Sequence, residues 1–509
     1  MYFTRLGTLA FAALLFFSFS QVCLYAQANF VYTNDDLEDV FGENTVSGFS
    51  VAANGVLTPI PGSPFQTGGV GSGGGLFAAN RVTTCIVGNF LYASNDVSAD
   101  VSGFSIAPST GVLTGVPGSP FPVAGTGGQS DISVACTPDG RFVIAANGNA
   151  NLITVFSRTA DGALVPIADS PFSTVATPAA IKVSADNRFL AVTELFINSI
   201  EMFSIATDGA LTTVSGSPFP GTSGVGFVAG VDINCTGNLL FAGKANESRI
   251  ASVDVFDISP NGALTPIPGS PFIPGAGSNS NVVLLSPDDE SLFVSNQDSS
   301  SVTVFTVGVG GSLTPVPGSP FPAPNGFLPS AMATDRSGTF LYVTDTRSIY
   351  VYSIGMEGAL TLTPGSPFFT GQPEGPDSLT AFPPKTCGLS PTFLTVSLNV
   401  KPGSAENSVN PRSKGVIPVA ILSTDSFDAG RVDTASVRFG VNEASPEGRA
   451  HLNDVNHDGF VDLVLHFRVQ DSGIQCGDAS VSITGQTVDG TPIEGSDTIR
   501  TVGCRGERN

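Results

Sequence analysis

The sequence of 509 residues contains no tryptophan, only three histidines and few charged side chains, and the last two scarcities exclude classes of protein or chemistry. Asp, Glu, Lys and Arg make up 13% of the residues, against ~25% in ordinary soluble domains, which argues against coiled coils and long solvated helices. The formal net charge of −22 argues against a nucleic-acid partner, because the phosphates would be repelled. The histidines stand at positions 451, 457 and 466, so Ser–His and Cys–His catalysis is excluded from the chain before them.

What the sequence does contain favours a protein built of strands. Hydrophobic residues reach 41%, which is ample for a core, and 59 glycines and 37 prolines supply turns. Gly and Pro together stay below the ~25–30% at which low-complexity disorder becomes the default interpretation. With 37 phenylalanines and no helical periodicity, the composition predicts an all-β fold.

The strongest signal is an internal repeat that ends in Ser-Pro-Phe. It recurs with its phenylalanine at positions 65, 121, 172, 219, 272, 321 and 368. Every copy carries a leucine eight residues earlier, at positions 57, 113, 164, 211, 264, 313 and 360. One repeat parses into four short strands, at 330–334, 340–344, 349–354 and 358–361, separated by Gly, Asp and Ser turns. Four strands repeated seven times predict a seven-bladed β-propeller.

The two ends of the repeat region predict how the ring closes. The chain after residue 28 opens on the second strand of a blade, Phe30 to Thr33, with no first strand before it. The segment from Asp377 to Phe382 matches the position of a first strand. We therefore expect this late segment to complete the blade begun by residues 29–60, which removes exposed sheet edges.

The repeat also resembles a known family. Val31-Tyr-Thr-Asn34 and Leu341-Tyr-Val-Thr-Asp345 are each followed by a second strand pattern and a G-x-L-T strand, as in YVTN-type repeats. Residues 29–383 are similar to the seven-bladed lactonase-like (6-phosphogluconolactonase-like) propeller family. The resemblance implies an Arg/His/Glu group in the central cleft. Because the fold also hosts other functions, the resemblance alone does not assign an activity.

Candidate catalytic residues in the propeller do not form an obvious set. Glu194 is the candidate acid, and the candidate cations are Lys182, Arg188, Lys244 and Arg249. Glu194 stands where other repeats place Asn34, Asn95, Asn296 or Asp345, so it is equally readable as a hairpin-turn residue. The catalytic residues therefore stay unassigned at this level.

After Pro384 the repeat stops. Residues 384–393 are interpreted as a linker and residues 394–509 as a small β-sandwich-like domain, with strands expected at 395–400, 416–422, 435–439, 460–467 and 479–484. Within it, residues 454–462 read Asp-Val-Asn-His-Asp-Gly-Phe-Val-Asp and match the first nine positions of a calcium loop. The predicted Ca²⁺ ligands are Asp454, Asn456, Asp458, Asp462 and the carbonyl of Phe460. The alternative is an Asp-rich turn without metal.

The cysteines fit an oxidising compartment. Apart from Cys23, the six are Cys85, Cys136, Cys235, Cys387, Cys476 and Cys504, and none has C-x-x-C spacing. Six cysteines allow 15 pairings, and we expect Cys476 to pair with Cys504 because they flank the last stretch of the small domain. Cys85, Cys136 and Cys235 stand near the ends of expected first strands. They fit a thiol or metal site in the channel, small buried residues, or one disulfide between Cys85 and Cys136 of neighbouring blades.

The N-terminus is typical of a secretory signal. Arg5 precedes an uncharged, mostly apolar stretch at 6–19, and Ala26-Gln27-Ala28 gives a cleavage site. The stretch is shorter than the ~20 residues that a membrane span needs. We therefore expect residues 1–28 to be removed and the mature chain to be secreted, periplasmic or held at the cell surface, without membrane insertion.

Two functions follow from these observations. The first is an exported, non-catalytic, monomeric β-propeller that binds a protein, glycan or surface polymer through its loops, with the calcium module as an accessory. The alternative is a lactone hydrolase of the 6-phosphogluconolactonase-like type. The missing propeller histidine and the export signal favour the first, because a sugar-phosphate lactone is a cytoplasmic compound.

Overall fold

The computed structural model describes residues 29–504, except for 74–80, 129–131, 223–225, 247–250, 276–279, 324–327, 346, 356–357, 374, 388–393, 405, 425–426, 443 and 489–491. The predicted signal peptide lies outside these described residues. In the described residues, no helix has the length and apolar character that crossing a membrane requires.

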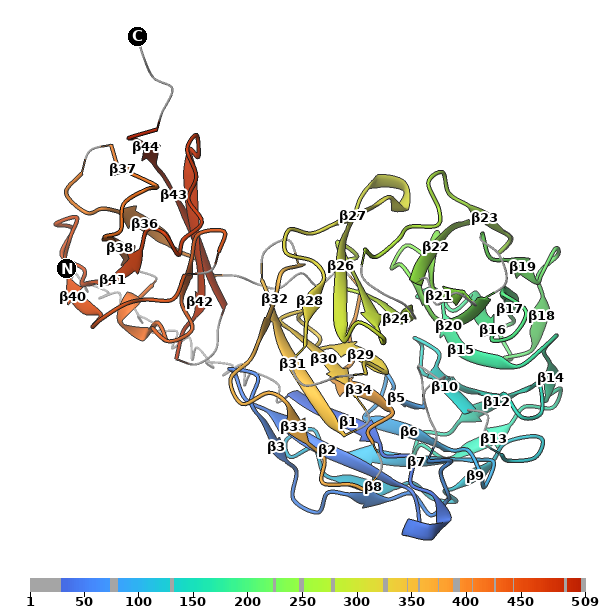
Figure 1. Cartoon of the computed structure of the whole chain (residues 1–509). Helices are drawn as coiled ribbons and strands as arrows, with labels where there is room; N and C mark the ends of the chain where they lie inside the picture. The colour runs from blue at the N-terminus through green and yellow to red at the C-terminus, as the bar shows by residue number, and fades with distance from the viewer. Residues whose placement is uncertain are drawn as a thin grey trace, which may run out of the picture.

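Seven sheets surround one axis, and the C-terminal domain lies to one side of the ring (Figure 1). From blade 1 to blade 7, the innermost strands are β34 (Ser378–Phe382), β5 (Val82–Thr84), β10 (Ile132–Cys136), β15 (Pro178–Val183), β20 (Gly226–Ile233), β24 (Ser280–Leu285) and β29 (Ala331–Thr334). The second strands are β1 (Asn29–Asn34), β6 (Phe90–Asn95), β11 (Phe142–Asn147), β16 (Phe189–Glu194), β21 (Leu239–Asn246), β25 (Ser291–Asn296) and β30 (Phe340–Thr344).

The outer strands follow the same order. The third strands are β2 (Thr45–Val51), β7 (Asp100–Ile106), β12 (Leu152–Arg158), β17 (Ser199–Ile205), β22 (Ala251–Ile258), β26 (Ser301–Val307) and β31 (Ser348–Ile354). The fourth strands are β3 (Leu57–Pro59), β8 (Leu113–Gly115), β13 (Leu164–Pro166), β18 (Leu211–Thr213), β23 (Leu264–Pro266), β27 (Leu313–Pro315) and β32 (Leu360–Leu362). Short strands β4 (Phe65–Gln66), β9 (Phe121–Pro122), β14 (Phe172–Ser173), β19 (Phe219–Pro220), β28 (Phe321–Pro322) and β33 (Phe368–Phe369) also pair with the third strand of their blade.

The predicted closure of the ring is confirmed. Strand β34 pairs antiparallel with β1, from Phe30 opposite Phe382 to Asn34 opposite Ser378. The last segment of the repeat region therefore supplies the innermost strand of the first blade. The seven-bladed, all-β architecture predicted from the repeat is confirmed as well.

The structure explains why each repeat ends in Ser-Pro-Phe. In every blade the serine Oγ accepts a hydrogen bond of 2.9 or 3.0 Å from a backbone N–H in the third strand; the pairs are Gly48 with Ser63, Gly103 with Ser119, Val155 with Ser170, Met202 with Ser217, Val255 with Ser270, Val304 with Ser319, and Val351 with Ser366. The serine thus ties the end of the fourth strand back to its sheet. Of the seven repeat phenylalanines, six are half-buried and Phe121 is fully buried.

The hydrophobic core consists of seven clusters, each lying between two neighbouring blades. One cluster, for example, joins Phe189 and Met202 of blade 4 to Leu240 and Phe256 of blade 5. A blade therefore buries both faces of its sheet, one against each neighbour. This arrangement holds the first strands in a ring and leaves their ends to line the channel.

The C-terminal domain has two four-stranded sheets with a core of its own. One sheet has the order β35 (Leu394–Thr395), β43 (Pro492–Thr498), β42 (Ser480–Gln486) and β39 (Arg438–Phe439); the other has β36 (Ser397–Val400), β38 (Val416–Leu422), β41 (Asp462–Arg468) and β40 (His451–Asn453). Strands β37 (Ser408–Val409) and β44 (Arg500–Thr501) form a further pair, and the domain has a 3-10 turn at η4 (Ala429–Arg431). The 3-10 turns η1 (Asp39–Phe41) and η2 (Val309–Gly311) belong to the propeller. The rings of Phe439 and Phe467 stack at 4.8 Å between the sheets.

Candidate functional site

The channel of the propeller holds a cavity of about 230 Å³ at the end where the first strands finish. All seven blades contribute to its lining, through the ends of strands β34, β5, β10, β15, β20, β24 and β29 and the turns after them. The segment 384–387, which follows β34 and which we call the strap, also lines this cavity. The lining mixes apolar side chains with threonines and two lysines, and convergent polar groups of this kind can orient a small-molecule ligand.

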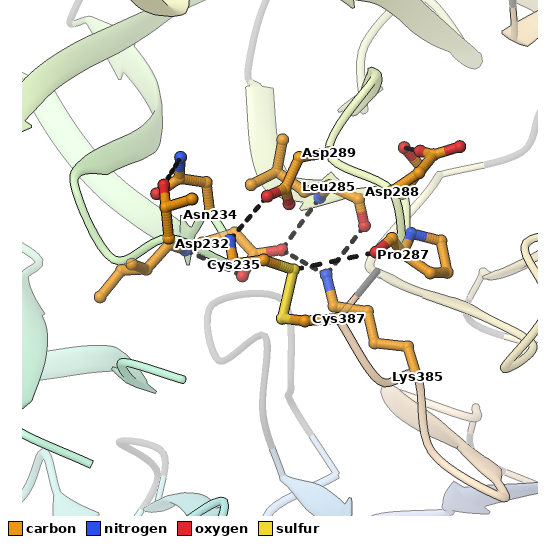
Figure 2. Close-up of a disulfide and its surroundings, with 12 residues drawn as sticks. Asp232, Asn234, Cys235, Leu285, Pro287, Asp288, Asp289, Lys385 and Cys387 are labelled. Carbon is orange, nitrogen blue, oxygen red and sulfur yellow. Dashed lines mark hydrogen bonds and ion pairs between the residues drawn. A yellow bond between two sulfur atoms is a disulfide. The ribbon is translucent and has the colours of Figure 1, made fainter. Parts of the chain in front are cut away.

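Two lysines in this cavity share one aspartate. Lys182 of β15 places its Nζ 2.6 Å from Oδ1 of Asp232, and Lys385 of the strap places its Nζ 2.9 Å from Oδ2 of the same carboxylate. Lys385 also donates to the carbonyl of Leu285 at 2.8 Å (Figure 2). The aspartate side chain is 2% exposed, whereas the lysines are 29% and 23% exposed. The charged side chains that line the cavity are therefore the two positive ones, although Asp289 also lies near Lys385.

A disulfide fixes the strap over this end of the channel. Cys387 of the strap pairs with Cys235, which follows β20, with a Cα–Cα distance of 5.3 Å (Figure 2). The backbone N–H of Cys235 donates to the carboxylate of Asp289 at 2.7 Å. The covalent link and the Lys385–Asp232 ion pair thus join the strap to the same blade.

The charges in the cavity shift one another's proton affinity. Burial by itself would raise the pKa of Asp232, but the ammonium groups of Lys182 and Lys385 outweigh it and hold that pKa well below its usual range. Burial lowers the pKa of Lys385, and the like charge of Lys182 acts in the same direction. Asp232 is therefore a fixed anion that orients two cations.

Hydrogen-bonding capacity remains in this cavity. An ammonium group has three donors; the contacts above use one of Lys182 and two of Lys385. Thr334 of β29 lines the same cavity, and its buried Oγ1 has no hydrogen-bond partner among the described residues. A ligand with acceptor oxygens would satisfy these groups.

The opposite end of the channel, where the first strands begin, carries a buried ion cluster of the other sign. The Nη1 atom of Arg81 contacts Asp36 closely and lies 3.2 Å from Asp96 and 3.8 Å from Asp377. Arg81 is fully buried. Burial raises the pKa of Asp96 to about 7 even though Arg81 lies beside it. Because these groups are enclosed, the cluster fits a structural role that joins blade 1, including its closing strand β34, to blade 2.

Strand register identifies one equivalent position at this end of every blade. In each blade, one residue of the second strand pairs with an aromatic residue of the third strand; in blade 4 these are Leu190 and Phe203. The equivalent position lies four residues after that second-strand residue. We call it the rim position; its residues are Asp35, Asn95, Asn147, Glu194, Lys244, Asn296 and Asp345. The sequence-based alignment put Asn34 in this series, and the register corrects it to Asp35. Glu194 is thus not exposed in a turn but fully buried.

The candidate residues named from the sequence do not converge. Lys182 lies in the cavity, Glu194 and Lys244 lie at the opposite end of their strands, and Arg249 lies outside the described residues. Arg188 is half exposed, pairs with Asp186 at 2.5 Å and lies over the ring of Phe189. Sequence reasoning missed Asp232 and Lys385, although the position of Lys385 beside the closing strand and Cys387 was an available signal.

Comparison with known proteins assigns the propeller to a family. The profile described as "Lactonase, 7-bladed beta-propeller" matches residues 26–174 and 250–368, which is more than half of the chain. The chain belongs to this family. A search of curated proteins gives no match.

Solved structures similar to this lactonase-family propeller share its fold at low sequence identity. They include a candidate 6-phosphogluconolactonase from Bacteroides fragilis (19% identity, TM-score 0.57, covering 70% of this chain and 98% of that chain). The periplasmic gluconolactonase PpgL from Pseudomonas aeruginosa is another (16% identity, TM-score 0.52, covering 67% and 98%). The covered share corresponds to the propeller without the C-terminal domain.

The acidic side chains of the predicted calcium loop in the C-terminal domain accept hydrogen bonds from backbone N–H groups, and Asn456 donates to Asp458 at 2.8 Å. Asp454 accepts from the N–H groups of His457 (2.7 Å) and Gly459 (3.0 Å), and Asp458 accepts from Phe460 at 2.8 Å. Asp462 is buried and accepts from Ser423 and Val455, both at 2.9 Å. In the described part of the chain, no three His, Cys, Asp or Glu side chains are arranged to hold a metal ion. Calcium binding here stays a prediction.

All six cysteines after the predicted signal are paired in the lactonase-family chain. Cys476 and Cys504, the pair expected from the sequence, lie 5.9 Å apart at Cα, within the ~4.4–6.8 Å that a disulfide needs. Cys85 and Cys136 link blades 2 and 3. The disulfide interpretation therefore applies to these two cysteines, rather than a thiol or metal site.

Proposed function

We propose that this lactonase-family chain hydrolyses a lactone in the cavity at the end of the channel that the strap covers. The observation that carries the proposal is the pair of partly exposed ammonium groups, Lys182 and Lys385, held by one buried carboxylate in a cavity of ligand size. Family membership supports the lactone as the substrate class. Fold alone would not, because one fold hosts many functions.

The chemistry needs no cofactor. Water adds to the lactone carbonyl carbon and releases a proton to the solvent, and negative charge develops on the carbonyl oxygen. The ring C–O bond then breaks, and the ring oxygen takes a proton from the solvent to give the hydroxy acid. Lys182 would stabilise the developing oxyanion, because a preorganised cation in a partly enclosed site lowers the barrier to charge formation. Asp232 would hold both ammonium groups in place rather than act as a base, since its pKa is strongly lowered.

The test is an acid-release assay on the mature chain with glucono-1,5-lactone and its 6-phosphate. The first substrate is suggested by the periplasmic gluconolactonase that shares the fold. We expect turnover above the uncatalysed rate, and a loss of at least about tenfold in kcat/KM for Lys182→Met, in the range of one lost charge-stabilising contact. Arg188→Met is the matched control, because Arg188 pairs with Asp186 at the surface. Wild-type activity in Lys182→Met would move the site elsewhere.

The second candidate is the non-catalytic binding protein favoured by the sequence. The observation in its favour is that the propeller sequence has no histidine to serve as a general base. Saturable binding of the lactone or the hydroxy acid, without turnover, would support this candidate over the first. Both proposals include export of the chain and a structural Ca²⁺ in the loop 454–462. The three disulfides support export, because disulfides persist in oxidising compartments.

A further inference from the structure

Blade 4 departs from the other blades in how its rim position is satisfied. In blade 1, Asp35 accepts hydrogen bonds from Thr45 (2.6 Å) and Ser47 (2.7 Å) on the third strand. In blade 2, Asn95 donates to Ser102 at 2.9 Å. In these blades a donor faces an acceptor across the two strands.

Blade 6 follows the same rule, since Asn296 donates to Thr303 at 2.8 Å. In blade 5, Lys244 occupies the rim position; burial lowers its pKa, and the carboxylate of Asp254 on the third strand opposes that shift. Four blades of the ring thus provide complementary partners at this position.

In blade 4 both partners are acids. Glu194 holds the rim position, and Glu201 stands on the third strand where blade 2 has Ser102 and blade 5 has Asp254. Their side chains are 0% and 2% exposed. Glu201 accepts from the N–H of Val175 at 3.0 Å, whereas Glu194 lies within reach of the Glu201 carboxyl group and the Ala176 N–H but makes no full hydrogen bond among the described residues.

A third oxygen lies on the same face of this sheet. Ser199 pairs directly with Glu194 in the strand register, and Glu201 follows two residues later, so the three side chains share one face. Ser199 is 5% exposed, and its Oγ has no hydrogen-bond partner among the described residues. The equivalent serine of blade 6, Ser301, receives a hydrogen bond from Asn296 at 3.3 Å.

Two buried carboxylates side by side are costly unless a proton or a cation neutralises them. A shared proton would engage one oxygen of each glutamate and leave the Ser199 hydroxyl and the second oxygen of Glu194 without a full hydrogen bond. A divalent cation would engage these oxygens at once, because carboxylate oxygens are ligands that Ca²⁺ prefers and the serine hydroxyl is a neutral oxygen on the same face.

We propose that Glu194, Glu201 and Ser199 of blade 4 bind one calcium ion at the end of the channel opposite the lactone cavity. The site is distinct from the predicted calcium loop of the C-terminal domain, and it does not rest on the proposed lactonase activity. Its role is to replace, in blade 4, the donor–acceptor pair by which blades 1, 2 and 6 join their second and third strands.

The experiment uses the mature chain carrying Asp458→Ala, so that the loop in the C-terminal domain does not contribute. After EDTA treatment and removal of the chelator, calorimetric titration with Ca²⁺ should give one site per chain, and the propeller transition should move to higher temperature. Adding Glu194→Gln or Glu201→Gln should remove the heat and the shift. Glu290→Gln is the matched control, because Glu290 is exposed in blade 6, and it should leave both unchanged.

A second variant separates loss of calcium binding from loss of folding, because it carries the residue that other blades have at the rim position. Glu194→Asn places the residue of blades 2, 3 and 6 at the rim position, so the chain should fold and yet lose calcium binding. No heat and no shift with Ca²⁺ in the Asp458→Ala chain would overturn the proposal and leave the pair holding a proton. Calcium binding retained in Glu194→Asn would place the ion elsewhere and would overturn it as well.

Discussion

The two ends of the propeller channel carry opposite charge in different surroundings. Where the first strands end, two lysines share one aspartate, and their side chains are 29% and 23% exposed to a cavity. Where the first strands begin, Arg81 lies among three aspartates and is fully buried. The difference indicates that the basic end is suited to a ligand, because its charges are reachable, whereas the acidic end holds blades together.

Arg81→Met should give the largest effect, because it leaves buried aspartates without their cation. Breaking a buried pair from one side costs ~3–5 kcal/mol, and urea unfolding of the propeller should report a loss of that size. The control is Arg141→Met, whose exposed pair with Asp139 should be worth at most ~1 kcal/mol. An equal loss in the two variants would contradict the assignment of Arg81 to the buried frame.

Removing the strap disulfide should give the next largest effect. The bond between Cys235 and Cys387 spans 152 residues, so the double variant to serine should lose ~2–5 kcal/mol of propeller stability. It should also lower activity, since Lys385 is held by the same strap. The matched variant is Cys476→Ser with Cys504→Ser, which should destabilise only the C-terminal domain. Full activity in the first variant would show that the strap does not position Lys385.

The loop 454–462 of the C-terminal domain is an acidic segment that, unlike the buried aspartates around Arg81, is mostly exposed. If it binds Ca²⁺ as predicted, a hundredfold excess over Kd should stabilise the C-terminal domain by ~2.7 kcal/mol. Calorimetry with and without EDTA should show this shift in the wild type and its absence in Asp458→Ala. An identical C-terminal transition under both conditions would leave the loop as a turn without metal.

The two ends should also respond to pH in opposite directions. Burial and repulsion from Glu201 raise the pKa of Glu194 to about 9. When the pKa of a carboxyl group is higher in the folded chain than in the unfolded chain, its contribution to stability is fully present below the unfolded-state pKa. That contribution is lost as the pH rises through the folded-state pKa. In EDTA, stability should therefore fall between about pH 5 and pH 9, by at most ~1.4 kcal/mol per pH unit for one proton.

Thermal unfolding across this range compares the wild type with Glu194→Gln, which should show a smaller slope. Asp232 has the opposite sign, because its pKa is lowered. Its contribution is present above the unfolded pKa and is lost in acid, so Asp232→Asn should reduce the acid sensitivity instead. Identical pH profiles in the wild type and Glu194→Gln would contradict the buried acid pair.

The repeat alone predicted most of the fold for a physical reason. Four short strands with their turns are encoded locally, and Ser-Pro-Phe marks the place where the serine ties the fourth strand to the third. Ring closure by 377–382 also followed from the sequence, because one blade lacked a first strand and one first strand was left over. The Cys476–Cys504 pairing was accessible because both residues belong to one small domain.

The charged groups at the two ends of the channel were decided only by the tertiary structure. Lys385 and Asp232 are 153 residues apart, and no local pattern relates them until the ring closes and the strap crosses its end. Glu194 and Glu201 are close in sequence, yet their opposition depends on strand register and on burial by the neighbouring blade. The sequence by itself determined strands, turns and the number of blades, because these are local; which charges meet in the channel was decided by packing seven blades around one axis.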